Sequence, residues 1–140
     1  MRPSLIIPRI RAQVAGFSNR VASTAEFASA QILDVTVPAA FVVPLAEVVD
    51  ANQSMPLVTQ LFDDQFGVIV VVDNSVDSRG QAGAEQLSDL RDDLLTALVG
   101  WRPLPQYQPV TWQGSEHLAM DAARLWHQFN FGALRILQSS

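Results

Sequence analysis

The sequence predicts an α+β fold: one domain, residues 1–140, in which helices pack on a mainly antiparallel (mixed) sheet of about four strands. Three observations support this prediction. Leucines recur at helical spacing between Leu87 and Leu98, residues 66–73 are almost continuously apolar, and residues 125–131 show the two-residue alternation of a half-buried strand. The expected order along the chain is helix, helix, strand, strand, helix, strand, strand.

Two helices are expected near the N-terminus. Apolar residues recur at helical spacing at Ile6, Ile10, Val14 and Phe17. Because Pro8 has no backbone N–H to donate, this helix should begin near Pro8 or bend there. A second, short helix is predicted from Ser23, since Ser23 and Glu26 can satisfy each other's backbone N–H groups in a capping box. Its apolar face would hold Val21, Ala25, Ala28 and Ile32.

Two strands should follow these helices. The first is predicted over Ala39–Leu45, a β-branched stretch bracketed by Pro38 and Pro44, because proline favours strand ends and edges. Residues 50–64 are polar and show no steady period, so they should form a long loop or a hairpin arm. The run from Phe66 to Asp73 is apolar on both faces, which predicts a central strand with cover on each side.

The most regular helix is predicted from Leu87, Leu90, Leu94 and Leu98, and it should end at the C-cap candidate Gly100. The opposite side of this helix is acidic and holds Glu85, Asp89, Asp92 and Asp93. After a proline-rich linker over residues 102–109, the last third is predicted as a hairpin. Its arms cover about 109–118 and 124–137, with a turn near residues 120–122.

Composition excludes several classes of protein. The formal charge is −5, and all nine cationic residues are arginines scattered from Arg2 to Arg135, whereas a nucleic-acid binder needs a clustered basic stripe. Cysteine is absent and only two histidines are present, which excludes disulfides and the common zinc sites, and no cofactor is expected. The longest apolar run, residues 66–72, is far too short to span a membrane, so we expect neither a membrane protein nor an obvious secreted precursor.

Two motifs resemble catalytic or phosphate-binding arrangements. Residues 79–83, Arg-Gly-Gln-Ala-Gly, stand between a strand and a helix, but the chain has no lysine and the spacing departs from G-x-G-x-x-G. Glycines serving a loop and a helix start are the simpler interpretation.

Ser115, His117 and Asp121 are the residue types of a hydrolytic triad, yet nothing resembles a nucleophile elbow, so a polar hairpin face is favoured. His127 lies between apolar neighbours and is interpreted as a partly buried structural histidine. We therefore expect no catalytic residues and no enzyme.

Two pairs of carboxylates and three tryptophans are left with open roles. Asp63–Asp64 and Asp92–Asp93 are adjacent in sequence, so their side chains should diverge and neither pair forms a catalytic dyad. The acidic helix face is either solvated or paired with arginines of a neighbouring subunit. Trp101, Trp112 and Trp126 fit a core or a binding surface equally well.

The order of these motifs is similar to that of the tail terminator family of long-tailed bacteriophages. An arginine-bearing N-terminal helix is followed by Pro-Ala-Ala-Phe-Val-Val-Pro at 38–44 and Phe-Gly-Val-Ile-Val-Val-Val at 66–72. The leucine helix ends in Leu-Val-Gly-Trp-Arg-Pro at 98–103. The hairpin contains Val-Thr-Trp-Gln-Gly-Ser at 110–115 and Ala-Arg-Leu-Trp-His-Gln-Phe-Asn-Phe at 123–131.

The resemblance implies a structural protein of the virion tail, assembled in the cytoplasm of the host bacterium. Such a protein forms a ring, usually of about six copies, on the last ring of the tail tube protein. The ring stops tube polymerisation and presents a docking face to the head–tail connector protein, with DNA only as passing cargo. A net charge of −5 suits a lumen to which DNA must not adhere.

The candidate contact residues lie in two places. The segment 50–64, with Phe62, Asp63 and Asp64, is a candidate for contacts with the tube or with other subunits. Arg79 and Arg124 are candidates for pairing with the acidic helix face of a neighbour, at Glu85, Asp89 and Asp92.

Two alternatives to a terminator are left open. One is another neck, head–tail completion or tube subunit of the same virion, since such proteins can share a fold. The other is a small nucleotide-binding or hydrolytic enzyme, which would need a site in residues 74–83.

Overall fold

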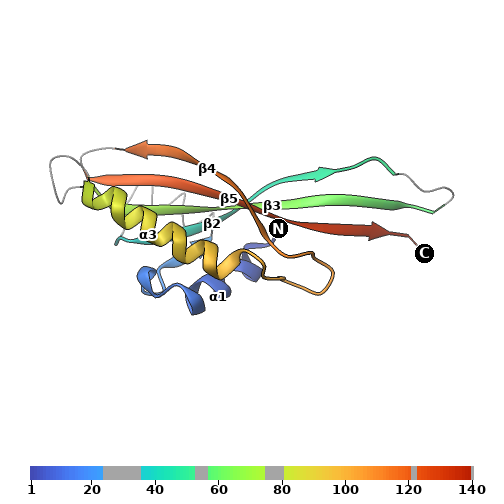
Figure 1. The fold of residues 1–140 in the computed structure, drawn as a ribbon, viewed down its shortest axis with the longest axis horizontal. Helices are drawn as coiled ribbons and strands as arrows, with labels where there is room; N and C mark the ends of the chain where they lie inside the picture. The colour runs from blue at the N-terminus through green and yellow to red at the C-terminus, as the bar shows by residue number, and fades with distance from the viewer. Residues whose placement is uncertain (24–35, 53–56, 75–80, 121–122, 140) are drawn as a thin grey trace.

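The protein forms one five-stranded sheet with two helices on it, as seen in a computed structural model that describes residues 1–23, 36–52, 57–74, 81–120 and 123–139 (Figure 1). The strand order is β1-β2-β3-β5-β4. The bounds are β1 Val21–Ser23, β2 Ala39–Val49, β3 Thr59–Asp73, β4 Thr111–Met120 and β5 Arg124–Gln138. β1 pairs with β2 in parallel and all other pairs are antiparallel, so the sheet is mixed and mainly antiparallel, as predicted.

The expected number of strands and order of elements were partly wrong. Val21 was expected on a second helix, but it belongs to β1, whose residues pair with Ala40–Val42 of β2. A strand of three residues is too short to show a two-residue period, which is why the sequence concealed it. The rest of the expected second helix, residues 24–35, lies outside the described residues.

The first helix, α1, spans Pro3–Gln13 and therefore begins five residues before Pro8, which corrects the predicted start. Pro3 takes the first turn, where a missing N–H costs nothing. Because Pro8 has no N–H, the carbonyl of Ser4, one turn earlier, has no helical donor. Both residues lie on the exposed side of α1, where water can hydrogen-bond to that carbonyl. The predicted apolar face is confirmed, because its members are all buried: Ile6, Ile10, Val14 and Phe17. Val14 and Phe17 follow α1, and the short 3₁₀ turn η1 spans Ala15–Phe17.

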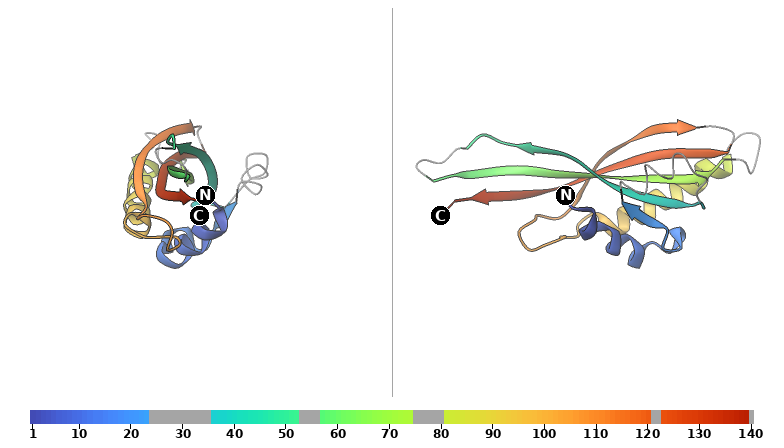
Figure 2. Two further views of the ribbon diagram at one scale, coloured as in Figure 1. Left: turned by 90° about the vertical axis from the view of Figure 1, so that its right-hand side faces the viewer. Right: turned by 180° about the vertical axis from the view of Figure 1, so that it is seen from behind.

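The leucine helix is confirmed as α3, Gln81–Leu98. Leu90, Leu94 and Leu98 are buried, and Gly100 has the left-handed φ of 86° that a helix C-terminus favours. Its acidic side is exposed, as predicted, at Glu85, Asp89, Asp92 and Asp93. Figure 2 shows α1 and α3 on the same side of a strongly twisted sheet.

Strands β2 and β3 are both longer than predicted. β2 continues past Leu45 to Val49, and β3 begins at Thr59. Of the two expectations for residues 50–64, the hairpin arm is therefore confirmed from Thr59 onwards. The C-terminal hairpin is confirmed by β4 and β5, while its turn at 121–122 lies outside the described residues.

The central strand β3 is buried on both faces over its second half, as predicted. Its even-numbered residues face α1 and α3, and Phe66 stacks on Phe131 with ring centroids 5.4 Å apart. On the opposite face Ile69 and Val71 join a smaller cluster. The other buried members of that cluster are Ala39, Phe41 and Val43.

Candidate assembly surface

Three strands continue beyond the helices as a ribbon, which we call the arm. It consists of residues 44–49 of β2, 59–64 of β3 and 133–138 of β5, and it projects from the helix-covered half of the sheet (Figure 1). The ladder between β3 and β5 is unbroken from Thr59–Gln138 to Asp73–Arg124, so the arm is a direct extension of the core sheet.

The two faces of the arm follow from its register, because residues paired across antiparallel strands lie on the same face. Leu61 pairs with Ile136, and Asp63 pairs with both Leu134 and Val48. We call this side the open face; its apolar members are Val48, Leu61, Leu134 and Ile136. The other side is continuous with the helix-covered face and carries Val49, Phe62, Arg135 and Leu137.

The arm is unusually apolar for an uncovered ribbon. Val48 is 53% exposed and Ile136 is 50% exposed, although strands normally bury such β-branched side chains. Among the described residues, most of the exposed large apolar side chains lie on the arm or beside it, at Val48, Val49, Leu57, Leu61, Leu134, Ile136 and Leu137. Contiguous exposed apolar surface of this kind marks an interaction site.

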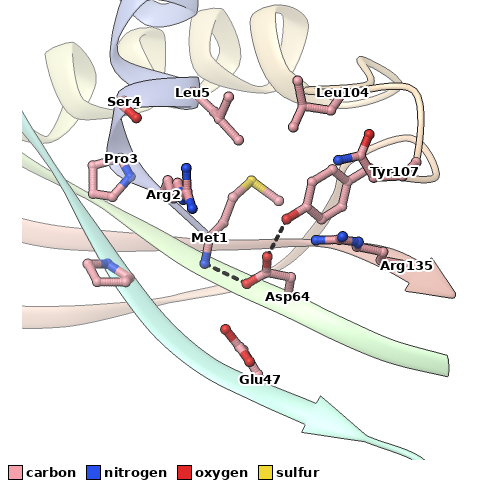
Figure 3. Close-up of a pocket in the computed structure, with 12 residues that line it drawn as sticks. Met1, Arg2, Pro3, Ser4, Leu5, Glu47, Asp64, Leu104, Tyr107 and Arg135 are labelled. Carbon is pink, nitrogen blue, oxygen red and sulfur yellow. Dashed lines mark hydrogen bonds and ion pairs between the residues drawn. The ribbon is translucent and has the colours of Figure 1, made fainter. Parts of the chain in front are cut away.

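A buried polar cluster fixes the base of the arm (Figure 3). The Met1 ammonium pairs with Asp64 Oδ1 at 2.5 Å, and the Tyr107 hydroxyl donates to Asp64 Oδ2 at 2.6 Å. Asp64 is only 4% exposed. The Arg135 guanidinium lies 5.8 Å from the Phe62 ring centroid and 5.6 Å from that of Tyr107. These contacts tie α1, the 102–109 linker and the arm together.

Burial is the main reason why the pKa of Tyr107 is raised above its usual 10.0, and the hydrogen bond and negative charge of Asp64 raise it further. Arg135 partly opposes this shift. The cluster borders a hollow of about 630 Å³ whose polar lining includes Arg2, Glu47 and Gln106. Both carboxylate oxygens of Asp64 have partners within the chain, Met1 and Tyr107, so the role of this cluster is structural.

A second polar contact crosses from β4 to the arm. Gln113 Nε2 donates to Asp63 Oδ2 at 2.8 Å, and Gln65 donates to the same oxygen at 3.0 Å. A Cβ on Gly132 would lie 2.3 Å from Gln113 Nε2 and 2.5 Å from Asp63 Oδ1, so a larger residue at this position would force the two side chains of this contact to shift. The divergence of Asp63 and Asp64 is confirmed, since they lie on opposite faces of β3.

The predicted contact residues fall at two distant parts of the fold. Phe62 and Asp63 lie half-buried on the arm, whereas Asp64 is buried against Met1 and Tyr107 and is not available at the surface. Glu85 and Asp89 lie on the exposed side near the start of α3, at the end of the molecule opposite the arm (Figure 1), and Asp92 lies one turn further along and pairs with Arg91 at 3.0 Å. Arg124 starts β5 opposite Asp73, and Arg79 lies outside the described residues.

The strongest surface feature escaped the sequence interpretation. The exposed apolar residues of the arm were not singled out, because Leu134, Ile136 and Leu137 look like ordinary strand residues. The sequence does contain a feature that indicates this surface: residues 133–137 are apolar on both faces of the strand apart from Arg135, and no further helix is predicted to cover them. Trp101 and Trp126 are partly buried beside the core clusters, whereas Trp112 is 43% exposed.

The motifs that suggested chemistry do not assemble into a site among the described residues. His117 pairs with His127 across β4 and β5, with ring centroids 6.2 Å apart, while Asp121 lies outside the described residues. Gly83 is packed against the Asp73 carbonyl rather than lining an anion site. In the described part of the chain, no cluster of three or more His, Asp or Glu side chains could hold a metal ion.

Burial lowers the pKa of His127 below its usual 6.5, and the neighbouring His117 lowers it further while Glu116 raises it. His127 is half-buried against Phe129, as a structural histidine would be. No described helix is both long enough and apolar enough to cross a bilayer.

Comparison with known proteins identifies the family. A family model described as phage tail terminator protein matches residues 1–138. A chain from the virion of a native gene transfer agent particle superposes with a TM-score of 0.51 at 15% identity, covering 96% of this chain and 94% of that one, which shows a shared fold. A second solved chain, at 19% identity and with 100% and 99% of the two chains covered, superposes with a TM-score of 0.42. Comparison with curated proteins yields no match. The chain belongs to the phage tail terminator family, whose members are structural proteins of the virion tail.

Proposed function

We propose that this chain, acting as a single domain over residues 1–140, closes the phage tail tube as a ring of about six copies. The ring stops polymerisation of the tube protein and offers its other side to the head–tail connector protein. Membership of the terminator family supports this role. The observation that carries it is the arm, whose two faces both expose large apolar side chains.

The arm argues for assembly because an apolar ribbon is costly to leave in water. Burying apolar surface contributes about 25 cal/mol per Å², and edge ribbons with exposed apolar residues associate unless they are covered. The polar cluster at Asp64 holds the arm in a fixed position relative to the core before any partner arrives. A preformed surface loses less conformational entropy on binding than a flexible one.

Charge is consistent with DNA passing through the ring. The net charge is −5, and the described exposed side of α3 carries Glu85, Asp89, Asp92 and Asp93. A lumen of this sign repels phosphates and leaves DNA as cargo rather than as a ligand.

The acidic side of α3 has a second candidate role in the ring. Arg79 and Arg124 of one subunit would pair with Glu85, Asp89 and Asp92 of the next. Charge reversal at Arg79 or Arg124 should then lower the mass of the ring measured by light scattering. An unchanged mass in both variants would remove these pairs from the interface.

The alternative is another neck, completion or tube subunit of the same virion. Electron microscopy of particles made without this chain separates the two: a terminator leaves overlong tails, whereas a connector leaves tails of normal length detached from heads.

A matched pair of variants tests the role of the arm in the same assay. Ile136→Asp places a charge on the open face, while Gln138→Asp places one two residues further along the same strand, where a polar side chain is already exposed. Ile136→Asp should lower the ring mass and lengthen the tails, and Gln138→Asp should do neither. Equal behaviour of the two variants would refute a role for the open face.

A further inference from the structure

A second exposed apolar feature lies where α3 ends and β4 begins. Gly100 turns the chain away from the helix, and its N–H bonds to the Val110 carbonyl at 2.9 Å, which brings Thr111 and Trp112 beside the last turn of α3. The result is a shallow, mainly apolar recess of about 580 Å³. We call it the recess, and its lining residues are Leu95, Thr96, Val99, Thr111 and Trp112.

The recess and the arm are separate patches on one subunit. Trp112 and Val99, at 43% and 46% exposed, are the large apolar side chains that the recess presents to solvent. Val99 directly follows α3 and Trp112 lies at the start of β4. The open face belongs to the arm, which projects beyond the helix-covered half of the sheet (Figure 1). The same arm therefore cannot fill its own recess.

A closed ring requires two different patches of this kind. In a cyclic assembly of more than two copies each contact is heterologous, so one surface of a subunit meets a different surface of the next. Building on the proposed ring, we infer that the open face of the arm seats in the recess of the neighbouring subunit.

Side-chain packing is favoured over strand addition, because β2 on the arm and the outer strand β4 both carry features that hinder strand pairing. On the arm, β2 holds Pro44 at its outer edge and shifts register between Pro44 and Glu47. On the other edge, β4 shifts register twice and contains Gly114 with a φ of 108°. Proline and bulges of this kind protect edge strands from extending a sheet.

Charge supports a second copy of this chain as the partner. On the open face, Asp63 is half-buried, and the exposed Asp50, which directly follows the β2 part of the arm, lies opposite Leu61. The arm's own cation, Arg135, is held on the other face over Phe62 and Tyr107. Arg102, three residues beyond Val99, is exposed and forms no ion pair with the described residues. An acidic arm therefore meets a recess with a cation beside it, which favours this pairing over arm against arm.

Cross-linking tests the contact cleanly, because the chain contains no cysteine. Ile136→Cys is placed on the arm and Val99→Cys in the recess, and a short bis-maleimide is added to the purified ring and to isolated tails. Neither single variant should cross-link alone. An equal mixture of the two should give covalent dimers and nothing larger, and the double variant should give a ladder that ends at the size of the ring.

The control and the contrary outcomes are distinct. Met120→Cys, 64% exposed at the far end of β4, replaces Val99→Cys as the control and should give no product with Ile136→Cys. Dimers from Ile136→Cys alone would overturn the inference in favour of arm-to-arm contact. If the ring is intact or the tails have normal length but no cross-link forms between positions 136 and 99, the arm-in-recess contact is overturned, while the terminator role is unaffected. Normal tails from particles that lack the chain would refute the terminator role itself.

Discussion

Removing the single tyrosine hydroxyl of the chain should loosen the base of the arm. Tyr107 is the only tyrosine, it is 4% exposed, and its hydroxyl lies 2.6 Å from Asp64 Oδ2. A hydrogen bond to a charged acceptor contributes about 1.5–3 kcal/mol. Tyr107→Phe keeps the ring beside Arg135, so we expect the free energy of unfolding to fall by about 2 kcal/mol, a roughly 30-fold change in the folding equilibrium.

Asp64→Asn provides the companion measurement. It preserves shape but leaves the buried Met1 ammonium without a charged partner, and breaking a buried pair in this way costs about 3–5 kcal/mol. Because both variants act on the same carboxylate, the double variant should lose less than the sum of the two single losses. Urea unfolding at a protein concentration where the oligomeric mass is constant measures all three.

The titration of Tyr107 gives an independent readout. Burial, and then Asp64, raise its pKa above 10.0, so the unfolded chain ionises first as the solution becomes alkaline. Above about pH 10 the folded state holds more protons, and the free energy of unfolding should fall as the pH rises towards the folded pKa. Tyrosinate absorbance follows this residue alone, and Asp64→Asn should lower the pKa. A loss below about 0.5 kcal/mol in Tyr107→Phe, with an ordinary tyrosine titration, would refute the buried contact.

Two further predictions concern the core half of the sheet. The pKa of His127 is lowered chiefly by burial, so the unfolded chain takes up a proton first, and the free energy of unfolding should decline as the pH falls below about 6.5. His127→Gln should flatten this dependence in urea unfolding, whereas His117→Gln should leave most of it; no difference between these two variants would contradict the assignment. Gly83→Ala tests the start of α3: helix propensity alone predicts a gain of about 1 kcal/mol. However, the new Cβ would lie 2.8 Å from the Asp73 carbonyl oxygen, so we expect a loss of about 1–3 kcal/mol in thermal unfolding, and a stabilised variant would count against this packing.

Local patterns of side chains predicted the elements whose burial follows one face. The leucine helix α3 and the apolar run of β3 were placed correctly, because the local order of apolar residues shows which side chains are buried: helical spacing in α3 and an unbroken apolar run in β3. β1 was not predicted, and for the first half of β3 the sequence left a loop and a hairpin arm open. Thr59–Gln65 is rich in polar residues that disfavour strands, and it is extended because its backbone pairs with β2 and β5.

The candidate surface could be predicted only in part for the same reason. Phe62, Asp63 and Asp64 were all predicted as contact residues of the 50–64 segment, but Asp64 differs from Asp63 through partners that are remote in sequence, Met1 and Tyr107. Likewise, nothing local separates Ile136, which no helix covers, from Phe131, which is buried. Exposure of an apolar strand depends on where the helices end, and that is a property of the assembled fold.

The ladder between β3 and β5 also sets the order in which the fold can form. Asp73 pairs with Arg124, while Thr59 pairs with Gln138, so the sequence separation of paired residues grows steadily towards the tip of the arm. Closing a longer loop costs more chain entropy and slows folding. The ladder should therefore zip from its core end outwards. The arm part of β5, with Leu134 and Ile136, would join the sheet last, after the core part of the ladder has paired, whereas β2 and β3 are nearest in sequence at the arm tip, where Val49 pairs with Phe62. This order limits the time in which a half-folded chain could aggregate through a completed apolar arm.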